Sequence, residues 1–168
     1  MNPENIIEKL GKNHFVFKHL FAETSFEEFN FKSNGNWSLL EVACHLLDEE
    51  IEDFRARIEH ILTTPDKPLK SISPQKWPLE RNYSGQDFGT VVERFLSERK
   101  KSLEWLKSLQ QPKWEQTVYH PAVGERSAKK FLFNWLAHDY HHIRQINRIQ
   151  HTFLKFSSGD DLTYAGKW

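Results

Sequence analysis

The chain has 168 residues, and its 23 lysines and arginines balance 23 aspartates and glutamates, so the formal net charge is zero. This balance leaves no basic excess to hold a phosphate backbone, which argues against a dedicated nucleic-acid-binding protein. The 13 phenylalanines and 6 tryptophans exclude a disordered chain. The single cysteine, Cys44, excludes an intrachain disulfide framework.

The sequence shows neither a signal peptide nor an apolar run of membrane-spanning length. We therefore expect a cytoplasmic protein with no membrane partner. The length suits one domain with a sizeable core. We expect a single domain over residues 1–168, with its core over residues 4–153 and a polar C-terminal tail.

The first predicted element is a helix over residues 4–21. Its apolar stripe has the +3, +4 spacing of one helix face and consists of Ile7, Leu10, His14, Phe17 and Phe21. Because His14 lies in the middle of this stripe, we expect a core histidine with satisfied hydrogen bonds rather than a ligand.

A second helix is predicted to begin at Ser38, because Ser38 and Glu41 have the spacing of a capping box. An unbroken stripe then indicates a long, straight bundle helix, and it consists of Leu40, Ala43, Leu47, Ile51, Phe54, Ile58 and Ile61. His45 falls far from the centre of this stripe, among glutamates. Periodicity alone therefore predicts that His45 is a surface histidine.

Residues 63–85 are not expected to be helical, because they contain four prolines, which are Pro65, Pro68, Pro74 and Pro78. At ~3.3 Å per residue this connector could run the full length of a bundle. The helices on either side of it could therefore be parallel and joined by a crossover. We expect Trp77 to fix the crossover to the bundle.

A third helix is predicted over residues 86–109, and its apolar stripe includes the polar residues Arg99 and Ser102. A buried arginine needs a partner. A carboxylate of another helix is favoured over an anionic substrate. Residues 110–126 form a second connector, in which we expect His120 to be exposed.

A fourth helix is predicted to follow the N-cap residue Ser127 and to end near Phe153. His138 and His142 lie one turn apart on its apolar face, whereas His141 points to the other side. Two imidazoles at this spacing can share one metal ion. The alternative is a pair of core histidines that bind backbone groups or water.

Three motifs then follow one another along the chain. The first is Asn36-Trp37-Ser38 followed by Glu41-Val42 and His45-Leu46-Leu47-Asp48. The second is His120-Pro121 followed by Gly124 and Ser127. The third is His138-Asp139-Tyr140-His141-His142 followed by Gln145-Ile146. In these motifs, and in their order from about residue 4 to residue 150, the chain resembles the DinB/YfiT-like superfamily of small helical metalloenzymes. The His-Leu-Leu-Asp step and the segment from Lys67-Pro68 to Trp77 look most like the branch that contains bacillithiol S-transferases.

The resemblance implies an all-α four-helix bundle in up-down-down-up order, with a long crossover between the second and third helices. It also implies a divalent metal ion held by His45, His138 and His142. Zinc and nickel both suit imidazole ligands. For His45 the resemblance replaces the surface interpretation, because a histidine near the start of a helix can line an open cleft at the bundle end.

Three neutral imidazoles leave a Zn²⁺-like ion with open positions for water or substrate. The charge of the ion lowers the pKa of bound water and turns a coordinated thiol into thiolate. Asp48, Glu49 and Asp139 are the carboxylates at hand to orient the imidazoles, and each could equally be a solvated charge on a helix face. We expect His141 and Arg144 to be surface groups.

Our leading hypothesis is a metal-dependent enzyme that transfers a low-molecular-weight thiol, of the bacillithiol type, to an electrophilic small molecule. A metal-dependent hydrolase is the first alternative, because the same site could activate water. A non-catalytic metal-binding bundle of the stress-response kind is the second. The many large apolar residues, together with the resemblance, lead us to expect a homodimer. The sequence does not identify the metal, the thiol or the electrophile. It also assigns no functional role to His14, Arg99 or His120.

Overall fold

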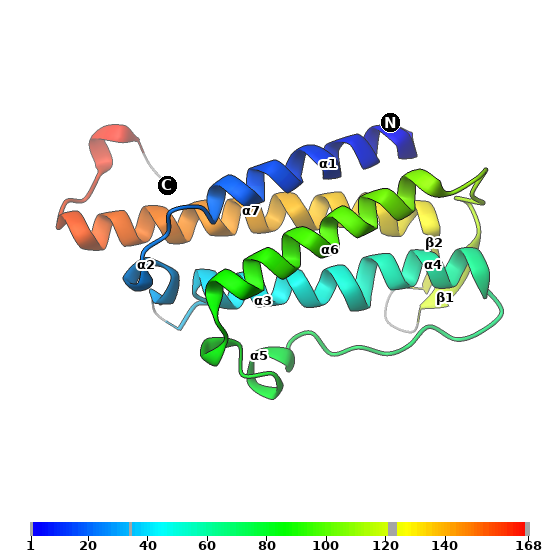
Figure 1. The fold of residues 1–168 in the computed structure, drawn as a ribbon, viewed down its shortest axis with the longest axis horizontal. Helices are drawn as coiled ribbons and strands as arrows, with labels where there is room; N and C mark the ends of the chain where they lie inside the picture. The colour runs from blue at the N-terminus through cyan, green and yellow to red at the C-terminus, as the bar shows by residue number, and fades with distance from the viewer. Residues whose placement is uncertain (1, 34, 121–123, 167–168) are drawn as a thin grey trace.

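Four long helical segments run side by side in the computed structural model, which describes residues 2–33, 35–120 and 124–166 (Figure 1). They are α1 (Pro3–Leu20), α3 (Leu39–Glu49) continued by η1 (Glu50–Phe54) and α4 (Arg55–Thr63), α6 (Phe88–Ser108), and α7 (Ala128–Ser158). The α3–α4 segment and α6 run parallel to each other, and α1 and α7 run in the opposite direction (Figure 1). The predicted all-α bundle with its up-down-down-up order is confirmed.

The helix boundaries follow from local capping. The backbone N–H of Ser38 donates to the Glu41 carboxylate at 2.9 Å, and the Glu41 N–H donates to the Ser38 hydroxyl at 3.3 Å, so the predicted capping box starts α3. Ser127 caps α7 as predicted. The last helix runs past its predicted end to Ser158, where Gly159 ends it with a φ of 68°.

The crossover between α4 and α6 runs back along the bundle, as its length allows (Figure 1). It contains the short turns α5 (Trp77–Glu80) and η2 (Tyr83–Gly85), whereas α2 (Phe26–Asn30) lies between α1 and α3. Trp77 is 4% exposed and belongs to the apolar core, so its predicted anchoring role is confirmed. The Arg81 guanidinium lies 4.2 Å from the centre of the Trp77 ring and adds a cation–π contact.

The second connector contains a short antiparallel hairpin that the sequence analysis did not predict. Strands β1 (Thr117–His120) and β2 (Gly124–Ser127) pair so that Val118 faces Arg126 and His120 faces Gly124. Val118 is buried against the bundle. His120 is half-buried, so the expectation that it is exposed is wrong. Pro121, quoted in the second motif, lies outside the described residues.

Two apolar clusters fill the bundle. The cluster that contains Trp77 also includes Phe17, Leu40, Leu47, Phe88 and Phe95. The other cluster includes Ile6, Leu10, Ile58, Leu132 and Trp135. The Arg99 guanidinium lies 5.5 Å from the Phe95 ring of the first cluster and 5.6 Å from the Trp135 ring of the second. A polar layer therefore separates the two apolar clusters.

This polar layer ties together all four helical segments. Arg99 donates to both oxygens of Asp139 at 2.7 Å and to Glu50 at 2.9 Å. Asn13 donates to Asp139 at 3.0 Å, and the Trp135 indole N–H donates to Glu50 at 3.2 Å. The expected carboxylate partner of Arg99 is thus confirmed, and Arg99 serves a structural role.

Helix η1 departs from the long, straight helix predicted for this segment. Residues Glu50–Phe54 form a π-helical turn. A π turn fits an extra residue into the helix and so turns the chain before it relative to the chain after it. As a result Glu50 is 1% exposed and reaches the polar layer, whereas Ile51, from the predicted stripe, is only half-buried.

The first helix is also turned slightly from its predicted orientation. Asn13 is 6% exposed and its amide reaches Asp139. The neighbouring His14 is half-buried, and its Nδ1 atom has no hydrogen-bond partner within the described part of the chain. The expected satisfied core histidine is therefore wrong. Its neighbour Asn13 takes the interior position, because the polar layer needs a donor there.

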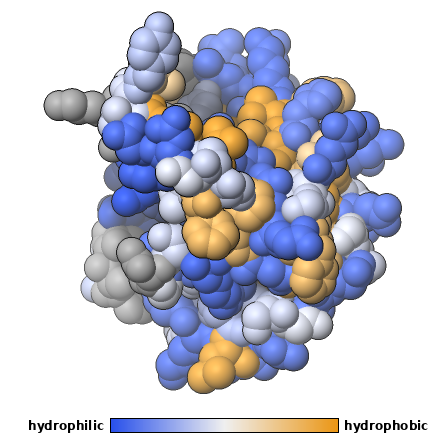
Figure 2. All heavy atoms as spheres, turned by 90° about the vertical axis from the view of Figure 1, so that its left-hand side faces the viewer, coloured by the Kyte–Doolittle hydropathy of each residue, from blue (hydrophilic) through white to orange (hydrophobic). Residues whose placement is uncertain are grey.

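The surface mixes apolar patches with hydrophilic groups. Figure 2 shows this mixture at the end of the bundle where α2 and the C-terminal half of α7 lie. The exposed large apolar residues include Phe26, Leu79, Tyr119, Leu154 and Phe156. Among the described residues, no helix is both long and apolar enough to span a membrane. The expected single domain, cytoplasmic location and homodimer stay predictions.

We predict that Arg99→Met lowers the free energy of unfolding by about 3–5 kcal/mol, because it leaves the buried carboxylates of Glu50 and Asp139 without their cation. Urea denaturation followed by far-UV circular dichroism measures this change. Arg94→Met is the matched control on the exposed side of the same helix, and its effect should stay within about 0.5 kcal/mol. Equal stability of the Arg99→Met variant and the parent would contradict the structural role of the polar layer.

Candidate metal centre

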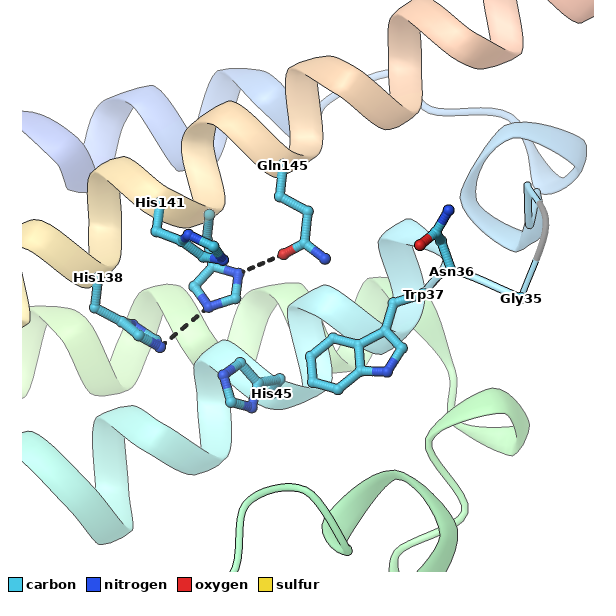
Figure 3. Close-up of a pocket in the computed structure, with 8 residues that line it drawn as sticks. Gly35, Asn36, Trp37, His45, His138, His141 and Gln145 are labelled. Atoms are coloured by element: carbon cyan, nitrogen blue, oxygen red, sulfur yellow. Dashed lines mark hydrogen bonds between the residues drawn. The ribbon is translucent and has the colours of Figure 1, made fainter. Parts of the chain in front are cut away.

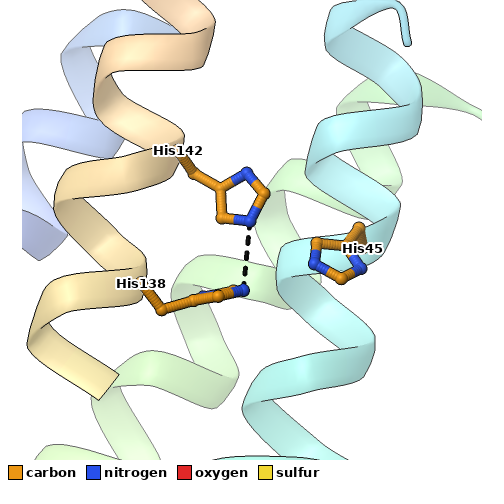
Figure 4. A group of neighbouring side chains, drawn as sticks. All are labelled: His45, His138 and His142. Atoms are coloured by element: carbon orange, nitrogen blue, oxygen red, sulfur yellow. Dashed lines mark hydrogen bonds between the residues drawn. The ribbon is translucent and has the colours of Figure 1, made fainter. Parts of the chain in front are cut away.

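Three histidine side chains converge between α3 and α7 (Figure 4). His45 comes from α3, and His138 and His142 come from successive turns of α7. One nitrogen of each imidazole lies within 4.8 Å of the corresponding nitrogens of the other two. The Nε2 atoms of His138 and His142 are 3.0 Å apart. The structure thus brings together the three residues that the resemblance implied as ligands.

The three imidazoles are neutral near pH 7. His45 is 7% exposed and His142 is 4% exposed, and His138 is half-buried. Burial, and then the other nearby imidazoles, lower the pKa of His45 to about 3 and that of His138 to about 2. Burial also lowers the pKa of His142, to about 4. Neutral imidazole is the form that binds a metal ion.

Gln145 orients the imidazole of His142. Its side-chain oxygen lies 2.7 Å from His142 Nδ1 (Figure 3). An amide oxygen can only accept, so Nδ1 carries the proton and Nε2 presents its lone pair. That lone pair points towards His138. A hydrogen bond of this kind to the far side of a ligand ring is typical of metal-binding histidines.

The donor set fits a divalent transition-metal ion. Two nitrogens bound tetrahedrally at ~2.0–2.1 Å would lie about 3.3 Å apart, close to the 3.0 Å between the Nε2 atoms of His138 and His142. Buried Nδ1 of His45 has no hydrogen-bond partner in the part of the chain that the structure describes. The His45 ring can therefore turn towards an ion without breaking such a bond.

The surface position that periodicity predicts for His45 is wrong. The face of α3 that carries His45 is covered by α7, and the Trp37 ring packs edge-on against His45 with their centres 5.0 Å apart. Glu41 and Glu49, whose charges suggested a solvated face, are 7% and 5% exposed. Glu41 is buried because it closes the capping box and pairs with Lys32.

Two of the three carboxylates considered as orienting groups point elsewhere. Asp48 accepts a hydrogen bond of 2.5 Å from the Tyr83 hydroxyl and pairs with Arg81, so it holds the crossover against α3. Asp139 is fully buried and holds Arg99 with both oxygens. Both carboxylates stabilise the helices that carry the histidines. Their hydrogen bonds and ion pairs are with residues other than the three histidines.

Glu49 is the carboxylate nearest to the imidazoles. Its Oε1 atom lies 4.0 Å from His45 Nε2. Burial, followed by the hydrogen bond with Asp53, raises the pKa of Glu49 to about 9. At neutral pH both Glu49 and His45 are therefore uncharged, and their contact is not an ion pair.

The histidines open into a pocket of about 500 Å³ (Figure 3). It is lined by Gly35, Asn36, Trp37, His45, His138, His141, His142 and Gln145. His141 is exposed as expected, but it lines this pocket and packs against His142. Trp37 and Gln145 belong to the sequence motifs, but no role was predicted for either residue. The spacing of Gln145, one turn after His142, is the signal that could have identified it.

Comparisons with known proteins agree with this architecture. A model of the DinB superfamily matches residues 13–146. Among solved structures, YfiT from Bacillus subtilis, described as "a probable metal-dependent hydrolase with an unusual four-helix bundle topology", is similar with a TM-score of 0.79. The match covers 90% of this chain and 87% of that chain at 16% identity, so it shows a shared fold. No curated protein matches the chain.

We predict that the purified chain binds one zinc or nickel ion and that His138→Ala/His142→Ala abolishes this binding, because two of three ligands are lost. Elemental analysis after extensive dialysis against buffer without metal measures the content. His19→Ala, an exposed histidine on α1, is the control and should keep the parent's content. Equal metal content in the double variant and the parent would show that the ion binds elsewhere.

Without metal, the protein should lose stability as the pH falls from about 6.5 towards 4. The ordinary histidine pKa of 6.5 applies to the unfolded chain, and the three folded values lie near 3, 2 and 4. The unfolded state therefore binds protons first, which costs up to roughly 1.4 kcal/mol per imidazole for each pH unit. Urea denaturation in EDTA measures the slope. His138→Gln/His142→Gln should make it shallower, and an unchanged slope would contradict the neutral buried histidines.

Proposed function

The chain belongs to the DinB superfamily, and we propose that it is a metal-dependent enzyme that transfers a small thiol to an electrophilic molecule. The observation that carries this proposal is the convergence of three neutral imidazoles at the wall of an open pocket. His45, His138 and His142 would hold one zinc or nickel ion. A structural metal site normally uses four protein ligands and is closed to solvent. Three ligands beside an open pocket therefore favour a catalytic site over a structural one.

A divalent ion bound there would act as a Lewis acid that favours the deprotonated form of a coordinated thiol or water. The residues of the chain prepare the site. Gln145 holds the proton on Nδ1 of His142 and so keeps Nε2 available. Trp37 packs edge-on against His45 and forms part of the pocket wall beside the three histidines.

The transfer itself is a substitution or a ring opening at carbon. The sulfur lone pair forms the C–S bond, and the bond from that carbon to the leaving group breaks with its electron pair on the leaving group. In an epoxide the leaving group is the ring oxygen, which takes a proton from solvent. The thiol proton goes to solvent, which reaches the pocket beside the exposed His141.

Thiol transfer is favoured over hydrolysis by a second cavity that also reaches His138 and His141. Two substrates need two binding regions that meet at the reacting atoms. Hydrolysis by the same three-histidine site is the alternative, and YfiT, which shares the fold, is described in those terms. A non-catalytic metal-binding bundle is the further alternative.

We predict that the zinc- or nickel-loaded chain accelerates conjugation of bacillithiol or cysteine to 1-chloro-2,4-dinitrobenzene, followed by product absorbance. The acceleration should persist below the free thiol pKa of about 8.5, because thiolate forms in the site. His45→Ala should remove most of the rate with the fold intact, since the metal is lost. Cys44→Ser is the matched neighbouring control and should retain the rate, because burial raises the pKa of the Cys44 thiol to about 12.

Three outcomes would count against thiol transfer. Metal-dependent cleavage of simple esters or amides without any conjugation would establish the hydrolase instead. Full metal occupancy with neither reaction would favour the binding bundle. Loss of activity in Cys44→Ser with the metal still bound would contradict every mechanism that relies on the three histidines alone.

A further inference from the structure

A second cavity, of about 430 Å³, adjoins the histidine pocket. The two cavities share His138 and His141. From these residues the first cavity extends along α7 towards Gln145, whereas the second extends towards Phe131. The second cavity is lined by Phe54, Arg126, Phe131, Asn134, Ala137, His138 and His141.

The walls of this cavity are largely aromatic and are held in place by their neighbours. The Phe54 ring stacks on Trp135 with centres 5.7 Å apart, and it lies 5.0 Å from the ring of His138. The Phe131 ring faces the guanidinium of Arg57 at 5.6 Å. Two fixed aromatic rings beside a metal-binding histidine suit a flat, apolar ligand group.

Arg126 reaches this cavity because of the hairpin register. It is paired directly with Val118, and side chains of directly paired residues lie on the same face of a hairpin. Val118 is buried against the bundle, so Arg126 is also on the inner face. The alternate pair, Tyr119 with Glu125, is exposed on the outer face.

The described residues that line the cavity include one arginine and no carboxylate. Among the described residues that line the cavity, Arg126 is the one permanently charged group. Within the described residues, the guanidinium of Arg126 donates a hydrogen bond of 2.9 Å to the carbonyl of Glu125, and a guanidinium has five N–H donors in all. The nearby Arg57 is neutralised by its ion pair with Asp53.

We propose that this cavity binds the electrophilic substrate and selects a flat aromatic group that carries an acid, such as an aryl carboxylate. The ring lies against Phe54 and Phe131, and the acid pairs with Arg126 by charge-assisted hydrogen bonds. The reacting carbon then lies towards His138, where the thiol arrives from the first pocket. This assignment rests on the proposed thiol transfer, but the binding itself can be tested without turnover.

The first test is the binding of 2-naphthoate and of its neutral isostere 2-naphthamide to the zinc-loaded chain by isothermal calorimetry. Arg126→Gln should raise the Kd of naphthoate about tenfold or more and change that of naphthamide by less than about twofold. Phe131→Ala should weaken both ligands. Arg148→Gln, an exposed arginine of α7, is the matched control and should change neither. Equal naphthoate affinity of Arg126→Gln and the parent overturns the proposal, and it would mean that the carboxylate binds the metal or another surface.

The second test compares 4-chloro-3-nitrobenzoate with 4-chloro-3-nitrobenzamide as electrophiles in the thiol conjugation. Arg126→Gln should raise KM for the benzoate alone and leave kcat unchanged, because Arg126 binds the acid and takes no part in the C–S step. Binding with the predicted dependence on Arg126 but no conjugation of either compound supports the cavity and rejects thiol transfer. Conjugation with KM values that neither Arg126→Gln nor Phe131→Ala alters overturns the cavity assignment and leaves thiol transfer intact.

Discussion

The paired hydrogen bonds between Arg99 and Asp139 are the constraint on which the arrangement of the bundle and of the candidate site depends. Asp139 directly follows His138 in α7, and both oxygens of its carboxylate are held by one guanidinium. A bidentate pair of this kind fixes direction as well as distance. It therefore fixes the rotation of α7 about its own axis. Because successive side chains on a helix project at about 100° to each other, this rotation also sets the direction of the neighbouring His138. The same rotation directs His138 and His142 towards His45.

The other members of the polar layer extend this constraint to the second helix of the bundle. Glu50 reaches Arg99 and the Trp135 indole because the π turn of η1 rotates it inward. His45 lies about one and a half turns before Glu50 in the same helical segment. The contacts of Glu50 therefore fix the position of α3 against α7 close to the three histidines. Burial of these charges is costly in itself and is offset by their mutual contacts. We infer that the polar layer fixes geometry, and that the two apolar clusters on either side supply most of the stability.

Helical periodicity and capping residues predicted the four helices and the crossover, because each signal is local. Ser38 with Glu41, and Ser127, start their helices as expected. The sequence-based predictions were wrong where contacts between helices determine which side chains are buried. His45 is buried because α7 and Trp37 cover a face that looks polar in the sequence, and Asn13 replaces His14 in the interior because Asp139 needs a donor. The hairpin was missed because its strands are short and lie in a connector with turn residues. Without the motif resemblance, His45 would not have been grouped with His138 and His142.

We propose that these three imidazoles hold one divalent ion with open positions facing the pocket. Anomalous diffraction at the zinc edge, from crystals of the zinc-loaded chain, tests it most directly. We expect one peak per chain at ~2.0–2.1 Å from a nitrogen of each of His45, His138 and His142, with the remaining ligands supplied by solvent. A fully loaded chain with its ion on other residues, or with a fourth protein ligand closing the site, would contradict it.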